Sequence, residues 1–170
     1  MLPEISKLDA AVDRAFDRVR GPGVDGFVYR LSSAADHSLL WQTCGAANAL
    51  ARGGDAQFAV RFAAAMGAES LLTNGVVKTM FRRVRPAHYD DIDFRHGLHR
   101  PITTSFPSGH ATAAFCAATL LGGGPAWYAL ATGVAATRVY VKLHHASDVA
   151  AGAAFGLVLG FAARRFVTGR

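Results

Sequence analysis

Apolar residues recur at helical spacing in the first part of the chain. The first 20 residues carry one apolar stripe on an otherwise charged segment, made up of Ile5, Leu8, Val12, Phe16 and Val19. Spacings of three and four residues place these positions on one face of an amphipathic helix. Such a helix lies on a membrane surface or caps a helical bundle, and the pattern favours neither. We therefore predict an amphipathic N-terminal segment within residues 1–30, broken by the turn-rich sequence RGPGVDGF.

Beyond this break the chain is mostly apolar, is dominated by Ala, Leu and Gly, and has few β-branched runs. This composition favours helix over strand. Five helices are predicted, over approximately 34–52, 56–77, 109–122, 125–142 and 146–166. A chain of 170 residues is expected to form one domain, here residues 1–170. The predicted fold class is all-α, a bundle of about five core helices plus the N-terminal amphipathic helix.

Two long uncharged stretches suggest that the bundle is embedded in a membrane. Residues 101–137 and 149–163 contain no Asp, Glu, Lys or Arg, and 51% of the whole chain is apolar. Within the second stretch, Gly152, Gly156 and Gly160 form a row on one helix face, which allows another helix to approach closely. A soluble alanine-rich bundle remains the alternative, because the helices are short or interrupted relative to the ~20 apolar residues that span a bilayer.

The distribution of basic residues predicts an orientation. The C-terminal sequence ARRFVTGR is typical of a cytoplasmic end. Crossing back through the last helix places the loop around His144 outside, and two more crossings place segment 78–108 on the same side. We therefore predict a multi-pass protein of the cytoplasmic membrane with its polar site on the extracytoplasmic face. Segment 78–108 is itself basic, against the positive-inside rule, which calls for a functional explanation.

The overall charge narrows the classes of partner. A formal net charge of +6 suits nucleic acid, anionic lipid or a phosphorylated substrate. The basic residues of segment 78–108 lie beside histidines and are not interleaved with aromatic residues along one face, which argues against nucleic acid. Cys44 and Cys116 lie in apolar stretches without zinc-like spacing, so they predict neither a disulfide framework nor a structural metal.

The first polar cluster is KTMFRRVRP, residues 78–86. Lys78 and Arg85 are seven residues apart, which is about two helical turns, so both cations can point the same way. Pro86 ends any helix at this point. A planar arginine fork combined with a compact lysine charge suits an oxyanion site, although a solvated basic face is the alternative for this cluster alone.

The second polar cluster is SFPSGHA, residues 105–111. Ser108 is predicted to cap a helix, and Gly109 allows its backbone to approach a ligand. Free backbone amides at a helix N-terminus attract anions, and His110 in the first turn would face a bound anion. A plain helix cap with an incidental histidine is the alternative.

The third polar cluster is TRVYVKLHHASDV, residues 137–149. Asp148 follows His144 by four residues, close enough to bond the imidazole, which leaves the other ring nitrogen free as a nucleophile or base. The competing interpretation is a metal site that uses His110, His144, His145 and Asp148. We disfavour it because Lys78, Arg85 and Arg138 in the same place would repel a cation and attract an anion.

These clusters resemble a known set of motifs. K-x6-R-P at Lys78–Pro86, P-S-G-H at Pro107–His110 and T-R-x5-H-x3-D at Thr137–Asp148 are similar, in order and spacing, to the signature motifs of the type 2 phosphatidic acid phosphatase (PAP2) superfamily. That superfamily includes bacterial acid phosphatases and vanadium haloperoxidases. The third motif usually begins with Ser, and Thr137 keeps the hydroxyl group.

The resemblance implies a role for each matching residue. His144 would attack phosphorus and form a phosphohistidine, Asp148 would orient and polarise it, and His110 would protonate the leaving oxygen. The phosphate oxygens would be held by Lys78, Arg85, Ser108, the amide of Gly109 and Arg138. The family needs no metal, and no cofactor is expected. The other basic residues of the loop are expected to be solvated or to bind a head group: Arg82, Arg83, His88, Arg95, His96, His99 and Arg100.

The motifs and the apolar helices together predict a membrane lipid phosphatase, with a lipid phosphate as substrate and membrane lipids as partners. The candidate substrates are a polyprenyl phosphate or diphosphate, a polyprenyl-phosphosugar such as decaprenylphosphoryl-5-phosphoribose, phosphatidic acid and phosphatidylglycerol phosphate. The compact chain is similar in size to bacterial members that dephosphorylate the phosphosugar lipid. The alternatives are a vanadate-dependent haloperoxidase and a non-catalytic basic helical membrane protein.

Overall fold

The computed structural model describes residues 3–86, 98 and 101–169. Within these ranges the regular structure is helical and no strand occurs. The elements, in chain order, are α1 (Pro3–Asp17), α2 (Pro22–Ala34), the 3₁₀ turn η1 (Asp36–Ser38), α3 (Leu39–Ala51), α4 (Ala56–Ser70), the π-helix η2 (Leu71–Val76), the 3₁₀ turn η3 (Val77–Met80), α5 (Gly109–Leu120), α6 (Pro125–Tyr140) and α7 (Ala146–Thr168). The predicted all-α class is confirmed.

The five predicted core helices correspond to α3 to α7, with two differences near the N-terminus. The first core helix begins at Leu39 and not at residue 34, because His37 and Ser38 adopt left-handed backbone conformations with φ of 53° and 60°. The predicted break at RGPGVDGF is too long: the chain leaves helix only between Asp17 and Pro22, where α2 starts. Proline is favourable in the first turn of a helix, where its missing N–H is not needed, and Asp25 adds a favourable acidic charge there.

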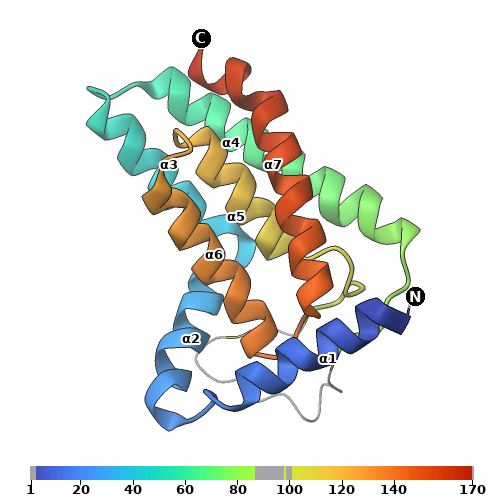
Figure 1. Ribbon diagram of the computed structural model, residues 1–170. Coiled ribbons are helices and arrows are strands. Elements are labelled where there is room, and N and C mark those ends of the chain that lie inside the picture. Colours follow the sequence, from blue (N-terminus) through green and yellow to red (C-terminus); the bar gives the residue numbers. More distant parts are fainter. Residues whose placement is uncertain (1–2, 87–97, 99–100, 170) are drawn as a thin grey trace.

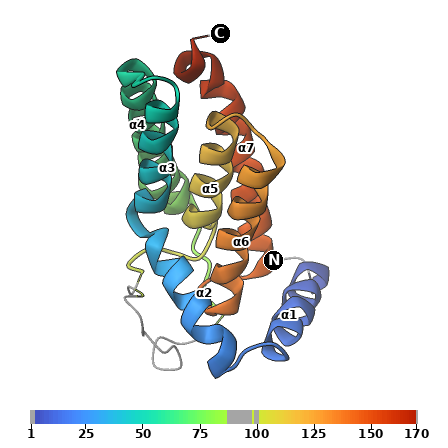
Figure 2. The same ribbon diagram turned by 90° about the vertical axis from the view of Figure 1, so that its left-hand side faces the viewer.

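Helix α5 occupies the centre of the bundle. Figure 2 shows α3 and α4 on one side of it and α6 and α7 on the other. Residues around its whole circumference are buried, including Ala111, Ala114, Ala117 and Leu120, all at 0% exposure. A helix that is apolar on every face is stable only inside a core. This central helix carries His110 in its first turn, so the buried core also fixes one end of the polar site.

Helices α5 and α7 pack backbone to backbone because of the predicted glycine row. A Cβ atom added at Gly156 would lie 2.3 Å from the carbonyl oxygen of Thr112, and one at Gly152 would lie 2.5 Å from that of Ser108. At Gly160 it would lie 2.7 Å from the Cβ atom of Thr119. The prediction that this row allows a close helix approach is confirmed.

The close approach joins two of the sequence clusters. The backbone N–H of Ser108, before α5, donates to the carbonyl of Asp148, in the first turn of α7, at 3.0 Å. Because this bond is between main-chain atoms, it fixes the relative position of the two helix N-termini whatever the side chains do. The second and third clusters therefore meet at one end of the bundle.

Helix α1 crosses that same end of the bundle, below α6 and α7 in Figure 1. Asp9 is the buried residue of this otherwise exposed helix. Phe16 packs edge-on against Tyr140 of α6, with ring centroids 6.2 Å apart. Helix α1 therefore caps the bundle, while Leu8 and Val19 of its apolar stripe remain 61% and 55% exposed. Contact of α1 with a membrane surface stays a prediction.

Helix α7 is apolar but largely uncovered. Among the described residues it is the one helix long and apolar enough to cross a membrane, and only 22% of its most apolar stretch is buried. Val158, Phe161 and Phe166 expose more than half of their surface. Spanning of a membrane, by α7 or by the other helices, stays a prediction.

We predict that Gly156→Ala separates α5 from α7. The added methyl group would overlap the main chain of Thr112, which cannot rotate away, so the free energy of unfolding should fall by about 1–3 kcal/mol. The measurement is the melting temperature, followed by helical circular dichroism.

The matched control for this prediction is Gly133→Ala in α6, where a Cβ atom meets nothing within 4 Å. This control should melt at the parental temperature or above it, because alanine favours helix over glycine. Equal melting temperatures for the two variants would contradict the role of the glycine row.

Candidate active site

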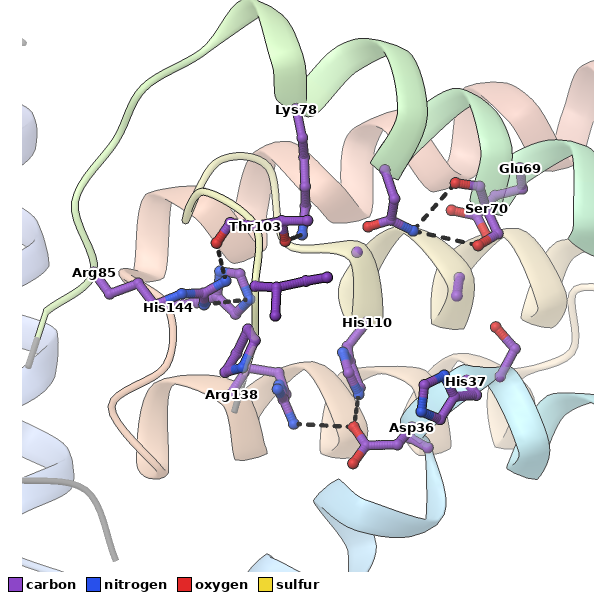
Figure 3. A pocket seen from close by; sticks show the side chains of 17 residues that line it. Asp36, His37, Glu69, Ser70, Lys78, Arg85, Thr103, His110, Arg138 and His144 are labelled. Carbon is purple, nitrogen blue, oxygen red and sulfur yellow. Dashed lines mark hydrogen bonds and ion pairs between the residues drawn. The ribbon is translucent and has the colours of Figure 1, made fainter. Parts of the chain in front are cut away.

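A cavity of about 280 Å³ opens at the end of the bundle where η3, α5, α6 and the loop before α7 meet. Six of the eight residues singled out in the sequence line it: Lys78, Arg85, Gly109, His110, Arg138 and His144. The other two, Ser108 and Asp148, are fully buried behind its wall at 0% exposure. Figure 3 shows Lys78, Arg85, His110, Arg138 and His144 around one space, although they come from separate segments of the chain.

Two arginines, Arg138 buried and Arg85 partly buried, line the cavity. Arg85 is held by carbonyl groups, since its Nη2 donates to those of Thr103 and Thr104 at 2.9 and 3.2 Å and its Nη1 donates to that of Leu143. Arg138 is 2% exposed, and its Nη1 donates to the hydroxyl of Ser32 at 2.5 Å. Each guanidinium is therefore fixed in place before any ligand arrives.

Lys78 completes this group of cations. Its side chain is 6% exposed, and its Nζ donates to the Thr103 hydroxyl at 3.1 Å. The pKa of Lys78 is lowered to about 8, first by burial and then by the charges of Arg85 and Arg138. Two buried cations and the partly buried Arg85 repel one another and form a site that an anion would stabilise.

The N-terminus of α5 faces the same cations. The Ser108 hydroxyl accepts from the backbone N–H of Ala111 at 3.4 Å, as expected of a capping serine. A Cβ atom at Gly109 would lie 3.0 Å from Asn74 Oδ1 and 3.7 Å from Lys78 Nζ. Because only glycine leaves this space open, an anion beside Lys78 can also approach the first backbone amides of α5.

His144 and Asp148 face each other at the start of α7. The Nδ1 atom of His144 lies 3.8 Å from Oδ2 of Asp148, within ion-pair range but long for a hydrogen bond, and its Nε2 lies 3.3 Å from Nη1 of Arg85. Burial lowers the pKa of His144 well below its usual range; Asp148 opposes this effect and the nearby cations reinforce it. The imidazole is therefore neutral near pH 7, with Nε2 directed into the cavity.

The partner of His110 was missed by the sequence analysis. Its Nε2 lies 2.7 Å from Oδ1 of Asp36, which belongs to η1 and is 3.9 Å from the guanidinium of Arg138. The available signal was that Asp36 is the one Asp, Glu, Lys or Arg between residues 31 and 51. That signal does not say what the carboxylate contacts, because His110 is 74 positions away.

Arg83 was expected to be solvated or to bind a head group, and the structure places it elsewhere. Its side chain is 13% exposed and forms ion pairs with Asp148 and with Asp9 of α1. Arg82 is exposed, as expected. The remaining loop residues of that set, namely His88, Arg95, His96, His99 and Arg100, lie outside the described residues.

The structure also bears on the competing metal site. In the described part of the chain, no group of three or more His, Cys, Asp or Glu side chains is arranged to hold a metal ion. His145 points away from the cavity, and its Nε2 lies 3.3 Å from the carbonyl oxygen of Val84. The absence of a metal requirement stays a prediction.

Two solved structures share this fold. One is a transmembrane PAP2-type phosphatidylglycerolphosphate phosphatase from Bacillus subtilis, which matches with a TM-score of 0.77 and 24% identity over 99% of this chain and 88% of that one. The other is LpxE from Aquifex aeolicus, with a TM-score of 0.72 and 24% identity over 92% of this chain and 94% of that one. At this identity the likeness concerns the fold alone.

Sequence comparison identifies more similar relatives. A decaprenylphosphoryl-5-phosphoribose phosphatase of Mycolicibacterium smegmatis is 36% identical over 137 residues, which covers 77% of this chain and 72% of that protein. The protein of the same name from Mycobacterium tuberculosis is 30% identical over 161 residues, which covers 92% of this chain and 86% of that protein. Residues 58–170 match the PAP2 superfamily as a whole, and this range holds all eight candidate site residues. The chain is therefore a phosphatase that belongs to the PAP2 superfamily.

Proposed function

We propose that this phosphatase removes the terminal phosphate of a polyprenyl-linked phosphosugar of the decaprenylphosphoryl-5-phosphoribose type. The observation that carries the chemistry is the meeting of three cations and two histidines in one cavity of about 280 Å³. The substrate class rests on relatives that carry that name and are 30–36% identical over most of the chain. Phosphatidic acid, phosphatidylglycerol phosphate and polyprenyl phosphates are the competing substrates.

The phosphate group would be held by fixed charges. Lys78, Arg85 and Arg138 would neutralise the nonbridging oxygens, and the first amides of α5 would donate to them through the opening at Gly109. In phosphoryl transfer, most of the catalysis comes from such positioning and electrostatic stabilisation. Arg85 and Arg138 are already held by backbone and hydroxyl oxygens, so little reorganisation is needed when the substrate binds.

In the first step, His144 would act as the nucleophile. Its neutral Nε2 forms a bond to phosphorus as the bond to the ester oxygen breaks, so the imidazole becomes positively charged. The carboxylate of Asp148 stabilises that charge at Nδ1, and we expect the 3.8 Å separation to shorten when phosphate is bound. Arg85, now 3.3 Å from Nε2, would move its hydrogen bond to a phosphate oxygen.

His110 would act first as the general acid and then as the general base. Burial and the charge of Arg138 lower the pKa of His110 to about 4 in the free protein, and the Asp36 carboxylate at 2.7 Å from Nε2 opposes them. A bound phosphate would add negative charge beside His110 and favour its protonated form. That imidazolium gives one proton to the departing ester oxygen, which leaves as an alcohol. In the second step, neutral His110 takes a proton from water as the water oxygen attacks phosphorus. The bond between phosphorus and His144 breaks, and inorganic phosphate leaves.

We propose that the chain is a multi-pass protein of the cytoplasmic membrane with this site at the outer face. Large apolar side chains are exposed on several helices away from the site, including Leu50, Val60, Leu71, Val158 and Phe161. Arg164 and Arg165 lie near the far end of α7, about 28 Å along the helix from its start at 1.5 Å per residue, and favour that end as cytoplasmic.

The first prediction from this proposal concerns the substrate. Purified protein without added metal should release phosphate from a polyprenyl-linked 5-phosphoribose with a kcat/KM at least about tenfold above that for phosphatidic acid, a factor equivalent to about 1.4 kcal/mol. The measurement is phosphate release across a panel of polyprenyl and glycerolipid phosphates. A preference for a glycerolipid phosphate would overturn the proposed substrate class.

The second prediction concerns the nucleophile. His144→Asn should lower kcat by roughly 10³-fold or more, because removal of a nucleophile abolishes the covalent route. The control His145→Asn changes the same residue type one position along, on a side chain directed away from the cavity, and should stay within about twofold of the parent. Comparable activity of the two variants would show that His144 is not the nucleophile.

The third prediction concerns pH. Lys78 binds phosphate only when it is charged, so kcat/KM should fall as the pH rises through about 8, the pKa of this lysine in the free protein. The substrate phosphate loses its second proton near pH 6, so it does not contribute to this decrease of kcat/KM above pH 8. The decrease of kcat/KM should occur at higher pH in Lys78→Arg. It should stay at the parental pH in Lys7→Met, which alters an exposed lysine. A profile that remains flat to pH 9.5 would contradict the assignment.

A further inference from the structure

Asp9 of α1 is a buried carboxylate that points toward the start of α7. Its side chain is 4% exposed, on a helix whose other described residues are more open. It accepts the backbone N–H of Ser147 at 2.8 Å, the Ser147 hydroxyl at 2.8 Å and the Nη2 of Arg83 at 2.6 Å. Burial raises the pKa of Asp9, but the bonds from Ser147 and Arg83 outweigh it and keep the pKa below its usual range. The carboxylate is therefore ionised, and both of its oxygens accept hydrogen bonds.

Arg83 connects this carboxylate to the candidate active site. One nitrogen of its guanidinium, Nη2, donates to Asp9, and the other, Nη1, donates to Oδ1 of Asp148 and to the hydroxyl of Ser147 at 2.8 Å. The planar fork of arginine fixes the angle between its two partners. The position of Asp9 therefore sets the direction from which Arg83 reaches Asp148.

Asp148 is oriented by donors at both of its oxygens. Arg83 donates to Oδ1, while Oδ2 accepts the Ser105 hydroxyl at 2.5 Å and the backbone N–H of His145 at 2.9 Å. Oδ2 is also the oxygen that faces Nδ1 of His144 at 3.8 Å. With Oδ1 held by Arg83, the carboxylate cannot turn Oδ2 away from His144.

The charges along this chain of contacts also matter. Arg83 lies between two carboxylates, so its positive charge is shared by Asp9 and Asp148. If Asp9 lost its charge, the whole of that attraction would act on Asp148 and draw it away from His144. A second cavity, of about 210 Å³, is lined by both Asp9 and His144, so no intervening core separates α1 from this histidine.

We propose that Asp9 is a positioning residue for the phosphatase reaction, acting through Arg83 on the Asp148 carboxylate that polarises His144. The inference rests on the proposed function in so far as His144 is the nucleophile. It assigns a role in the reaction to α1, which precedes the range 58–170 that matches the superfamily. Asp9 touches neither the main cavity nor the phosphate, so it should affect the rate of the reaction and not the binding of the anion.

The test is Asp9→Asn, which keeps the shape of the side chain and removes its charge. We expect kcat to fall about tenfold, in line with the loss of an outer partner that orients a reactive histidine. KM and the inhibition constant for inorganic phosphate should stay within about twofold, because Lys78, Arg85 and Arg138 are untouched. The control is Asp17→Asn, which removes the same charge from the same helix at a residue paired with Arg20 and Lys142, and it should keep the parental kcat.

A double-mutant cycle separates positioning through Arg83 from a general effect on folding. In an Arg83→Met background, Asp9→Asn should cause no further loss of kcat, because the connection is already broken. The inference is overturned if Asp9→Asn keeps the parental kcat, or if it weakens phosphate binding by the same factor as it lowers kcat. It is also overturned if the fold-decreases in kcat caused by Asp9→Asn and by Arg83→Met multiply in the double variant. If His144→Asn is inactive and Asp9→Asn has the parental kcat, only the role of Asp9 is contradicted. If His144→Asn is active, the assignment of His144 as the nucleophile is contradicted.

Discussion

The backbone contact between α5 and α7 is the constraint on which the site depends. Three glycines of α7 admit α5 so closely that a methyl group at Gly156 would overlap the main chain of Thr112. At the same contact the Ser108 amide bonds the Asp148 carbonyl, so the anion-binding helix terminus and the His144–Asp148 pair form one rigid unit. A row of small residues that appears to serve only packing therefore also sets the catalytic geometry.

Around this unit the structure concentrates positive charge that a bound anion would stabilise. Arg85, Arg138 and Lys78 are each buried or partly buried and are held by carbonyl or hydroxyl oxygens. Asp36 contacts His110 and Asp148 faces His144, so each imidazole has a carboxylate partner. Asp36 and Glu69 also line the cavity, but the three cations outnumber these two carboxylates and leave the cavity suited to phosphate.

The sequence was sufficient to predict the main helices and to single out eight residues that the structure brings together at one end of the bundle, because helical periodicity and motif spacing are local properties. It was insufficient where a contact joins distant segments. Asp9 meets Arg83 across 74 positions and Ser147 across 138, and nothing in the local sequence of α1 indicates either partner. The misread start of α2 has a different cause, since glycine and proline mark turns on average but are compatible with the first turn of a helix that packs against α6.

The central claim is that one cavity holds the phosphate with Nε2 of His144 in line for attack. A crystal structure with vanadate, which adopts the geometry of the transferring phosphoryl group, tests it most directly. The account predicts vanadium bonded to Nε2 of His144, with oxygens within hydrogen-bond distance of Lys78, Arg85, Arg138 and the Gly109 amide. Vanadate bonded to His110, or bound away from these cations, would contradict it.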